Sequence, residues 1–189
     1  KKKILCREKG YHGSSYLAAT VSGTGREHDR RYMDTHQDLA IMLPNINPFI
    51  RPSGTSLEEW CNEKISEMEE TILSIGSDQI GCFIAEPILA SGGVIVPPSG
   101  YHQRSLELCK KHDIVYISDE TVTGFGRLGH WFASKEVFGI QPDIITCAKG
   151  LTSGYLPMGA AIISERLIDN IKNKDGSQPF TNGYTYSCH

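Results

Sequence analysis

The sequence contains 189 residues, of which 39% are hydrophobic and 22% are charged, and this composition is typical of a globular protein of one domain. Its formal net charge of −3 gives no electrostatic reason to expect nucleic acid or an anionic membrane as a partner. No apolar run approaches the ~18 residues that a membrane-spanning helix needs, so we expect no membrane partner.

The first half of the chain predicts one strand, a long connection and one helix. The apolar run within Lys3–Arg7 predicts the strand. Residues 43–54 include four prolines or glycines, which is typical of a connection. Apolar residues with helical spacing over residues 56–75 predict an amphipathic helix. Its first residue and Glu59 have the spacing of a capping box, and Gly76 is placed to end it.

The second half predicts strands at residues 80–85, 114–118, 143–147 and 159–163, with a helix at residues 100–112. Several of these strands are continuous apolar runs, as expected when helices cover both faces of a parallel sheet. Strands that alternate with helices in this way indicate one α/β domain with a mainly parallel sheet flanked by helices.

The six cysteines are scattered along the chain without a CxxC pair, and most of them stand inside apolar runs: Cys6, Cys61, Cys82, Cys109, Cys147 and Cys188. This pattern is typical of buried free thiols in a reducing compartment. It favours neither a disulfide framework nor a zinc site. We therefore expect no metal and a cytoplasmic location.

A carboxylate stands directly at the end of one predicted strand. Asp119 follows residues 114–118 and precedes a turn with glycines at Gly124 and Gly126. Ligands of open α/β sheets bind outside the carboxyl ends of the strands, so Asp119 can point into a binding cleft. The alternative is that its side chain only caps a turn or a helix.

A lysine follows the next predicted strand. Lys149 comes after residues 143–147 and is flanked by Ala148 and Gly150. This position predicts a partly desolvated ammonium, and desolvation makes a lysine amine a better nucleophile. The alternative is a lysine whose long side chain reaches the surface.

Together, the two residues suit pyridoxal 5′-phosphate (PLP). A lysine holds this cofactor as a Schiff base and later moves a proton, while an aspartate keeps the pyridine nitrogen protonated so that the ring draws electrons. Lys149 and Asp119 follow strands that are neighbours along the chain, so both side chains can face one ligand.

Short motifs across the whole chain occur in the order of a known family. They are Gly-Tyr-His-Gly-Ser at 10–14, Ala-Glu-Pro-Ile at 85–88, Gly-Gly-Val-Ile at 92–95, Pro-Pro-Ser-Gly-Tyr at 97–101, Ser-Asp-Glu at 118–120, Thr-Gly-Phe-Gly-Arg at 123–127, Pro-Asp-Ile at 142–144, Ala-Lys-Gly-Leu-Thr-Ser-Gly-Tyr at 148–155 and Gly-Tyr-Thr-Tyr-Ser at 183–187. In this order they resemble a class III (omega-type, subgroup II) aminotransferase of PLP-dependent transferase fold type I.

The resemblance implies roles for four residues and includes a fifth, His12, in the site. Lys149 would hold PLP and move the proton, and Asp119 would pair with the pyridinium nitrogen. Tyr11 would stack on one face of the ring, and His12 belongs to the same motif. Glu86 would lie near Asp119 and support the cofactor end of the site.

Three further positions follow from the same resemblance. Thr121 stands where the family has a valine that packs on the other face of the ring, and its hydroxyl needs a partner if it is buried. Thr185 would reach the PLP phosphate of the neighbouring subunit, which implies a homodimer with shared active sites. Cys188 replaces a glycine, and this substitution could strain a turn.

The resemblance also implies a domain assignment. We expect residues 1–189 to be the central part of the PLP-binding large domain. The N-terminal segment with its phosphate-binding loop and the C-terminal small domain would lie outside this sequence.

The implied activity is PLP-dependent transamination, from an amine or omega-amino acid donor to a 2-oxo acid such as pyruvate. Residues 151–155 resemble the omega-amino acid:pyruvate branch of the family. One alternative is another class III PLP enzyme, such as an aminomutase or a decarboxylase. A second is a catalytically inactive fragment that acts as a non-enzymatic protein. A Rossmann-type dehydrogenase is excluded because no GxGxxG follows the first strand.

Overall fold

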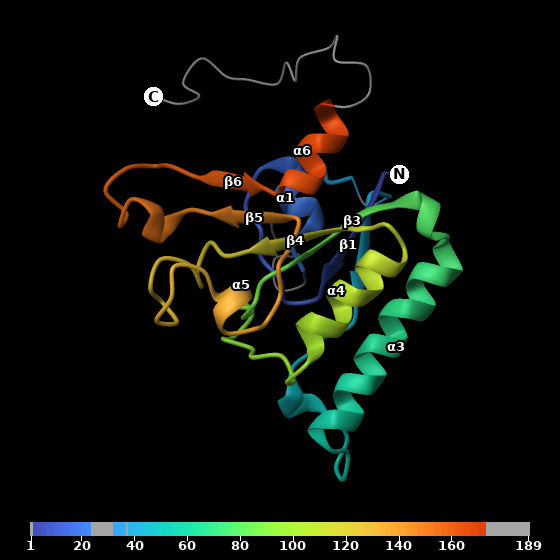
Figure 1. Cartoon of the computed structure of the whole chain (residues 1–189). Coiled ribbons are helices and arrows are strands. Elements are labelled where there is room, and N and C mark those ends of the chain that lie inside the picture. The colour runs from blue at the N-terminus through green and yellow to red at the C-terminus, as the bar shows by residue number, and fades with distance from the viewer. Residues whose placement is uncertain (1, 24–31, 37, 173–189) are drawn as a thin grey trace.

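A twisted sheet of six strands runs through the part of the chain that the computed structural model describes, residues 2–23, 32–36 and 38–172. The order across the sheet is β2-β1-β3-β4-β5-β6 (Figure 1). The strands are β1 (Lys3–Arg7), β2 (Ala40–Leu43), β3 (Ile80–Ala85), β4 (Val115–Asp119), β5 (Ile144–Cys147) and β6 (Ala160–Ile163). The first five are parallel, and β6 is antiparallel to β5, so the prediction of a mainly parallel sheet is confirmed.

All five predicted strands agree with the structure to within one residue at each end, but β2 was not predicted. It lies just before the connection that the sequence indicated, and it pairs only with β1 among the described strands. A four-residue strand at the margin of a sheet gives too short an apolar run to separate it from a loop.

Two long helices cover one face of the sheet. They are α3 (Leu57–Ile75) and α4 (Tyr101–Lys111), which lie side by side in Figure 1 and contact each other. Their apolar stripes pack with Leu5, Phe83 and Tyr116 of three neighbouring strands in one hydrophobic core. Shorter helices are α1 (Tyr16–Val21), α5 (Ala133–Glu136) and α6 (Glu165–Lys172), and 3₁₀ turns span Pro48–Ile50, Ser77–Gln79 and Lys149–Leu151.

The capping box predicted for the first long helix is present. Ser56 Oγ accepts a hydrogen bond from the Glu59 backbone N–H at 3.1 Å, and the Glu59 carboxylate accepts one from the Ser56 N–H at 2.7 Å. We expect Ser56→Ala to lower the free energy of unfolding by about 1 kcal/mol, measured by urea denaturation. Ser66→Ala, at an exposed position within the same helix, is the control and should not destabilise the protein.

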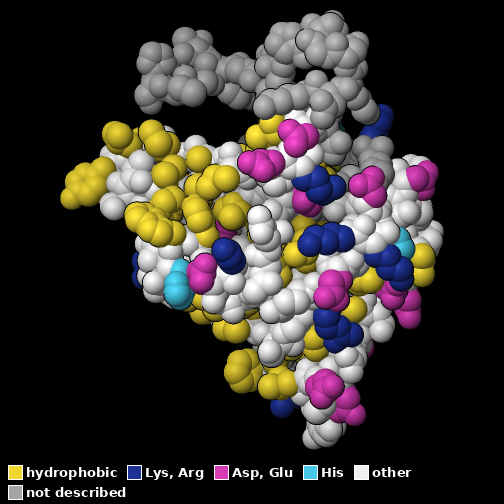
Figure 2. All heavy atoms as spheres, in the orientation of Figure 1, with side chains coloured by type: hydrophobic (Ala, Val, Ile, Leu, Met, Phe, Trp, Pro, Cys, Tyr) yellow, Lys and Arg dark blue, Asp and Glu magenta, His cyan; other side chains and the backbone are white. Residues whose placement is uncertain are grey.

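The described cysteines are buried, as predicted, except for the half-buried Cys82; Cys188 lies outside the described residues. Within the described part of the chain, no helix combines the length and apolar character of a membrane span. Figure 2 shows hydrophobic side chains gathered around the β5–β6 end of the sheet. Exposed residues of this region include Trp131, Tyr155 and Ile162.

Candidate functional site

Six of the seven predicted site residues line one cavity of about 80 Å³ at the carboxyl ends of the strands: Tyr11, His12, Glu86, Asp119, Thr121 and Lys149. The seventh, Thr185, lies outside the described residues. The segments after β1, β3, β4 and β5 each contribute to the cavity. The parallel pairing therefore gathers residues that are far apart in the sequence.

Asp119 is buried at the end of β4, and both of its carboxylate oxygens are hydrogen-bonded. Oδ2 lies 2.8 Å from His12 Nδ1, and Oδ1 accepts the Thr121 backbone N–H at 3.1 Å. Burial alone would raise the pKa of Asp119, but the hydrogen bonds from His12 and Thr121 outweigh it and lower the pKa below its usual 3.8. Because its pKa is lowered, Asp119 is an ionised carboxylate at neutral pH. The residue both caps a turn and faces the cavity.

His12 is fixed from two sides. Its ring is 3% exposed and contacts Asp119, while its backbone N–H donates to Ser22 Oγ at 2.9 Å. Ser22 in turn donates to the Ala18 carbonyl of α1. Because an ionised carboxylate only accepts hydrogen bonds, His12 must carry its proton on Nδ1 to bond Asp119.

Glu86 joins two of the loops that form the cavity. Oε1 accepts the Tyr11 backbone N–H at 2.7 Å, and Oε2 accepts the Ala90 N–H at 3.0 Å. Burial raises the pKa of Glu86, and these two N–H groups oppose the rise. The Tyr11 hydroxyl lies 2.9 Å from Ser14 Oγ. Glu86 therefore holds the segment that presents Tyr11 and His12 to the cavity.

Lys149 lies at the rim of the cavity rather than inside it. Its side chain is exposed in the described part of the chain, so the prediction of a partly desolvated ammonium is wrong. The chain leaves the sheet after Cys147 and makes a 3₁₀ turn, with a positive φ of 34° at Lys149, which carries the residue beyond the packed layer. A Cβ on the next residue, Gly150, would lie 2.8 Å from Phe125 Cβ, so this turn requires glycine.

Thr121 stands between two cavities. It lines the 80 Å³ cavity with Asp119, and it also lines a neighbouring cavity of about 370 Å³ that includes Arg127 and Gly150; Lys149 borders both. Its backbone N–H donates to Asp119 Oδ1, and its side chain also contributes to the lowered pKa of Asp119. Thr121 is only partly buried, so its hydroxyl is not sealed from solvent.

The sequence did not single out Glu120, which is fully buried beside Asp119. Its carboxylate accepts the backbone N–H groups of Ala133 and Ser134 at 2.8 and 2.7 Å, and the Thr123 hydroxyl at 2.8 Å. These bonds shape the loop that carries Thr121. The only signal in the sequence is an acidic residue at a strand end, where exposed glutamates are also common. Val122 and Ser91 also line the 80 Å³ cavity, and no motif or residue pattern in the sequence indicated them as site residues.

Replacement of Glu120 tests this loop. We expect Glu120→Gln to lower the free energy of unfolding by about 1.5–3 kcal/mol, because the amide turns an N–H group toward donors that need an acceptor. Urea denaturation measures the change. Glu136→Gln alters an exposed carboxylate of α5 and should leave stability unchanged; an equal loss in both variants would contradict the assigned role.

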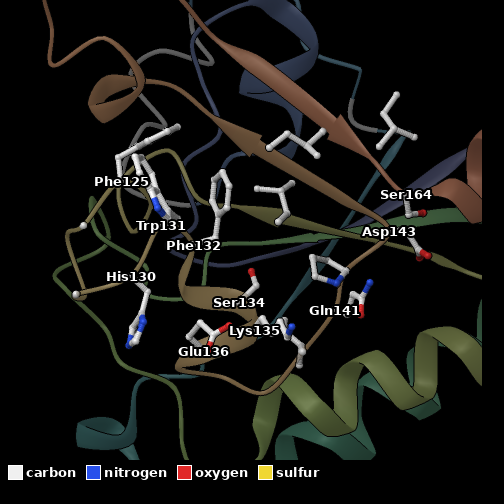
Figure 3. A pocket seen from close by; sticks show the side chains of 17 residues that line it. Phe125, His130, Trp131, Phe132, Ser134, Lys135, Glu136, Gln141, Asp143 and Ser164 are labelled. Atoms are coloured by element: carbon white, nitrogen blue, oxygen red, sulfur yellow. The ribbon is translucent and has the colours of Figure 1, made fainter.

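A larger cavity of about 800 Å³ lies against β5, β6 and α5 and shares no lining residue with the 80 Å³ cavity. Figure 3 shows Phe125, Trp131 and Phe132 on one side of it, and Ser134, Lys135 and Glu136 of α5 on another. None of the predicted site residues within the described part of the chain lines it. Its size alone therefore does not identify the functional site.

Comparison with known proteins agrees with this geometry. The family model "Aminotransferase class-III" matches residues 1–188. An uncharacterized aminotransferase (y4uB) of Sinorhizobium fredii is 40% identical over the whole chain, which covers 40% of that protein. Gamma-aminobutyrate transaminase 1, a mitochondrial protein of Oryza sativa, is also 40% identical over the whole chain, which covers 36% of its length.

Solved structures give the same result. The (S)-enantioselective omega-transaminase of Thermomicrobium roseum superposes with a TM-score of 0.90 at 37% identity, over 99% of this chain and 41% of that one. An omega-transaminase of Pseudomonas jessenii in complex with PMP has a TM-score of 0.85 at 35% identity, over 90% of this chain and 37% of that one. The chain spans about two fifths of the length of these relatives. The family model matches almost every residue of this chain, which shows that the chain belongs to the class III aminotransferases.

Proposed function

We propose that this chain holds PLP and carries the central chemistry of a transaminase, which moves an amino group from an amine or omega-amino acid to a 2-oxo acid such as pyruvate. One observation carries the proposal: an ionised, buried aspartate and a lysine border the same cavity at the ends of adjacent parallel strands. Class III aminotransferases use PLP, and a structural neighbour was solved with PMP.

The described residues fit this cofactor. Asp119 is negative and rigidly held, so it can pair with a protonated pyridine nitrogen. Tyr11 and Thr121 border the same cavity, and we assign them to the two faces of the ring. When bound, PLP draws electrons away from the substrate carbon that carries the amine.

Lys149 has two functions in this proposal. Its Nζ would hold the cofactor, and the same amine, when free, would move a proton between a substrate carbon and a cofactor carbon. Exposure at the rim suits the second function, because the amine must swing between two positions. Asp119 stays ionised and takes no part in the proton transfer to or from substrate.

The donor class rests on the relatives. Names among them include gamma-aminobutyrate transaminase and vanillin aminotransferase, and the structural neighbours are omega-transaminases. These names favour transamination over the aminomutase and decarboxylase alternatives. We also propose a homodimer in which Thr185 reaches the cofactor phosphate of the neighbouring subunit. The cytoplasmic location stays a prediction.

Absorbance and product analysis of the full-length protein test the proposal. With PLP bound, we expect an absorbance band near ~400–430 nm that borohydride abolishes, with the reduced cofactor on the peptide that contains Lys149. An amine donor and pyruvate should then yield alanine. A protein that shows the band but forms no alanine with any amine or omega-amino acid would exclude transamination while leaving PLP binding in place.

A further inference from the structure

A second, much smaller cavity lies next to the proposed cofactor site. Its volume is about 10 Å³, and its polar walls come from Arg7, His12, Glu86, Tyr101 and His102. His12 and Glu86 also line the 80 Å³ cavity, so these two side chains separate the two spaces. A volume of this size holds about one water molecule.

One ring nitrogen of His12 is directed at this small cavity. Nδ1 is occupied by Asp119, whereas Nε2 is buried and hydrogen-bonds none of the described residues. A Cβ built on Gly10 would lie 3.3 Å from His12 Nε2, 3.0 Å from the Arg7 carbonyl oxygen and 3.9 Å from Glu86 Oε1. The space above Gly10 is therefore bounded by three polar atoms, and Gly10 lines only the smaller of the two cavities.

The chemistry of these atoms selects the occupant. Nδ1 carries the proton that bonds Asp119, so Nε2 is an acceptor that needs a donor when the ring holds no second proton. The Arg7 guanidinium is already directed at the Pro44 carbonyl and the Tyr101 hydroxyl. The Arg7 carbonyl and Glu86 Oε1 are acceptors as well. A small molecule with two donor hydrogens satisfies Nε2 and one of these oxygens together, and water is such a molecule.

We propose that one fixed water molecule occupies this cavity, donating one hydrogen to His12 Nε2 and the other to the Arg7 carbonyl or to Glu86. The water holds His12 in the tautomer that bonds Asp119, so His12 is a positioning residue that acts through Asp119. A buried imidazole acceptor without a donor would be costly, and the water removes this cost. Only the consequence for the cofactor rests on the proposed function; the water and the tautomer do not.

Two measurements on the full-length protein test the water itself. A high-resolution crystal structure should contain one solvent peak within hydrogen-bonding distance of His12 Nε2. NMR of protein with ¹⁵N-labelled histidine should show the His12 proton on Nδ1, before and after PLP is added. The His12 signals are those lost in His12→Asn and kept in His130→Asn, which changes an exposed histidine. A cavity without the peak, or a proton on Nε2 in the neutral ring, would overturn the proposal.

A glycine variant tests the consequence. In Gly10→Ala the added Cβ enters the space of the water, so we expect the Nε2 signal to shift and PLP to be bound about 3- to 10-fold more weakly, as for the loss of one hydrogen bond. Gly159→Ala is the matched control, because its Cβ would meet nothing closer than 3.5 Å. If Gly10→Ala fails to fold, the crystal structure and the tautomer still decide.

The outcomes separate this inference from the proposed function. A water and an Nδ1–H tautomer in a protein that never shows the PLP band would support the inference while the proposed function fails. A PLP band with alanine formation in a protein whose cavity is dry would overturn the inference and leave the proposed function standing.

Discussion

Lys149→Ala should abolish both the cofactor absorbance near ~400–430 nm and transamination in the full-length enzyme. No other described lysine lines the cavity with Asp119. Under the proposed function, the loss of this amine would therefore remove the bond to PLP and the proton carrier together. We expect kcat to fall by at least about 10⁴-fold, because general acid–base catalysis alone contributes about 10²- to 10⁴-fold. Steady-state alanine formation and absorbance spectra measure the two losses.

The matched control is Lys110→Ala, which removes an exposed lysine from the last turn of α4. It should leave the spectrum and the rate unchanged. Added methylamine can partly replace the missing proton carrier in Lys149→Ala, which would separate chemistry from misfolding. If Lys149→Ala kept the absorbance band and a rate close to that of the wild type, Lys149 would not be the residue that holds the cofactor.

Asp119→Asn should keep the fold and lose most of the activity. The amide has the shape of the carboxylate and can still accept from His12, but it carries no charge to hold a proton on the pyridine nitrogen. We expect kcat/KM to fall by about 10²- to 10³-fold, the range for removal of one partner from a buried charge pair. Because the pKa of Asp119 is lowered, the wild-type carboxylate is ionised at every pH above its usual 3.8. In the variant, only solvent can supply the proton of the pyridine nitrogen, so the defect should be larger at pH 9 than at pH 6.

Asp78→Asn provides the control for this change, since it neutralises an exposed aspartate in the turn before β3. Its kcat/KM should match that of the wild type. A kcat/KM of Asp119→Asn equal to that of the wild type at pH 9 would contradict the role assigned to the carboxylate.

The sequence was sufficient to predict strands, a helix cap and two site residues where local residue patterns agree with the topology of the sheet. Continuous apolar runs located β1 and β3 to the residue, and the rule that ligands bind at the carboxyl ends of parallel strands directed attention to Asp119 and Lys149. Ser56 and Glu59 formed the capping box that their spacing predicted. In each case the physical cause lies within a few residues of chain.

Features that depend on distant contacts were not predictable. The bond between His12 and Asp119 joins residues 107 positions apart, and nothing near either of them in the sequence indicates it. Burial of Glu120 depends on Ala133 and Ser134, which come back to it only after a long loop. The exposure of Lys149 was missed because the side chain follows a buried strand but stands on a turn that leaves the sheet.

The construction of the site from separate strand ends has a consequence for folding. Each parallel pairing closes a long loop before it gains any contact, so these pairings form slowly and late. The cavity needs the segments after β1, β3, β4 and β5 together, and a folding intermediate without β5 has no Lys149 in place. A ligand that binds only the completed arrangement raises the population of the native state by mass action. Cofactor supply during expression should therefore determine the yield of native protein, and the gain should be smaller in Lys149→Ala.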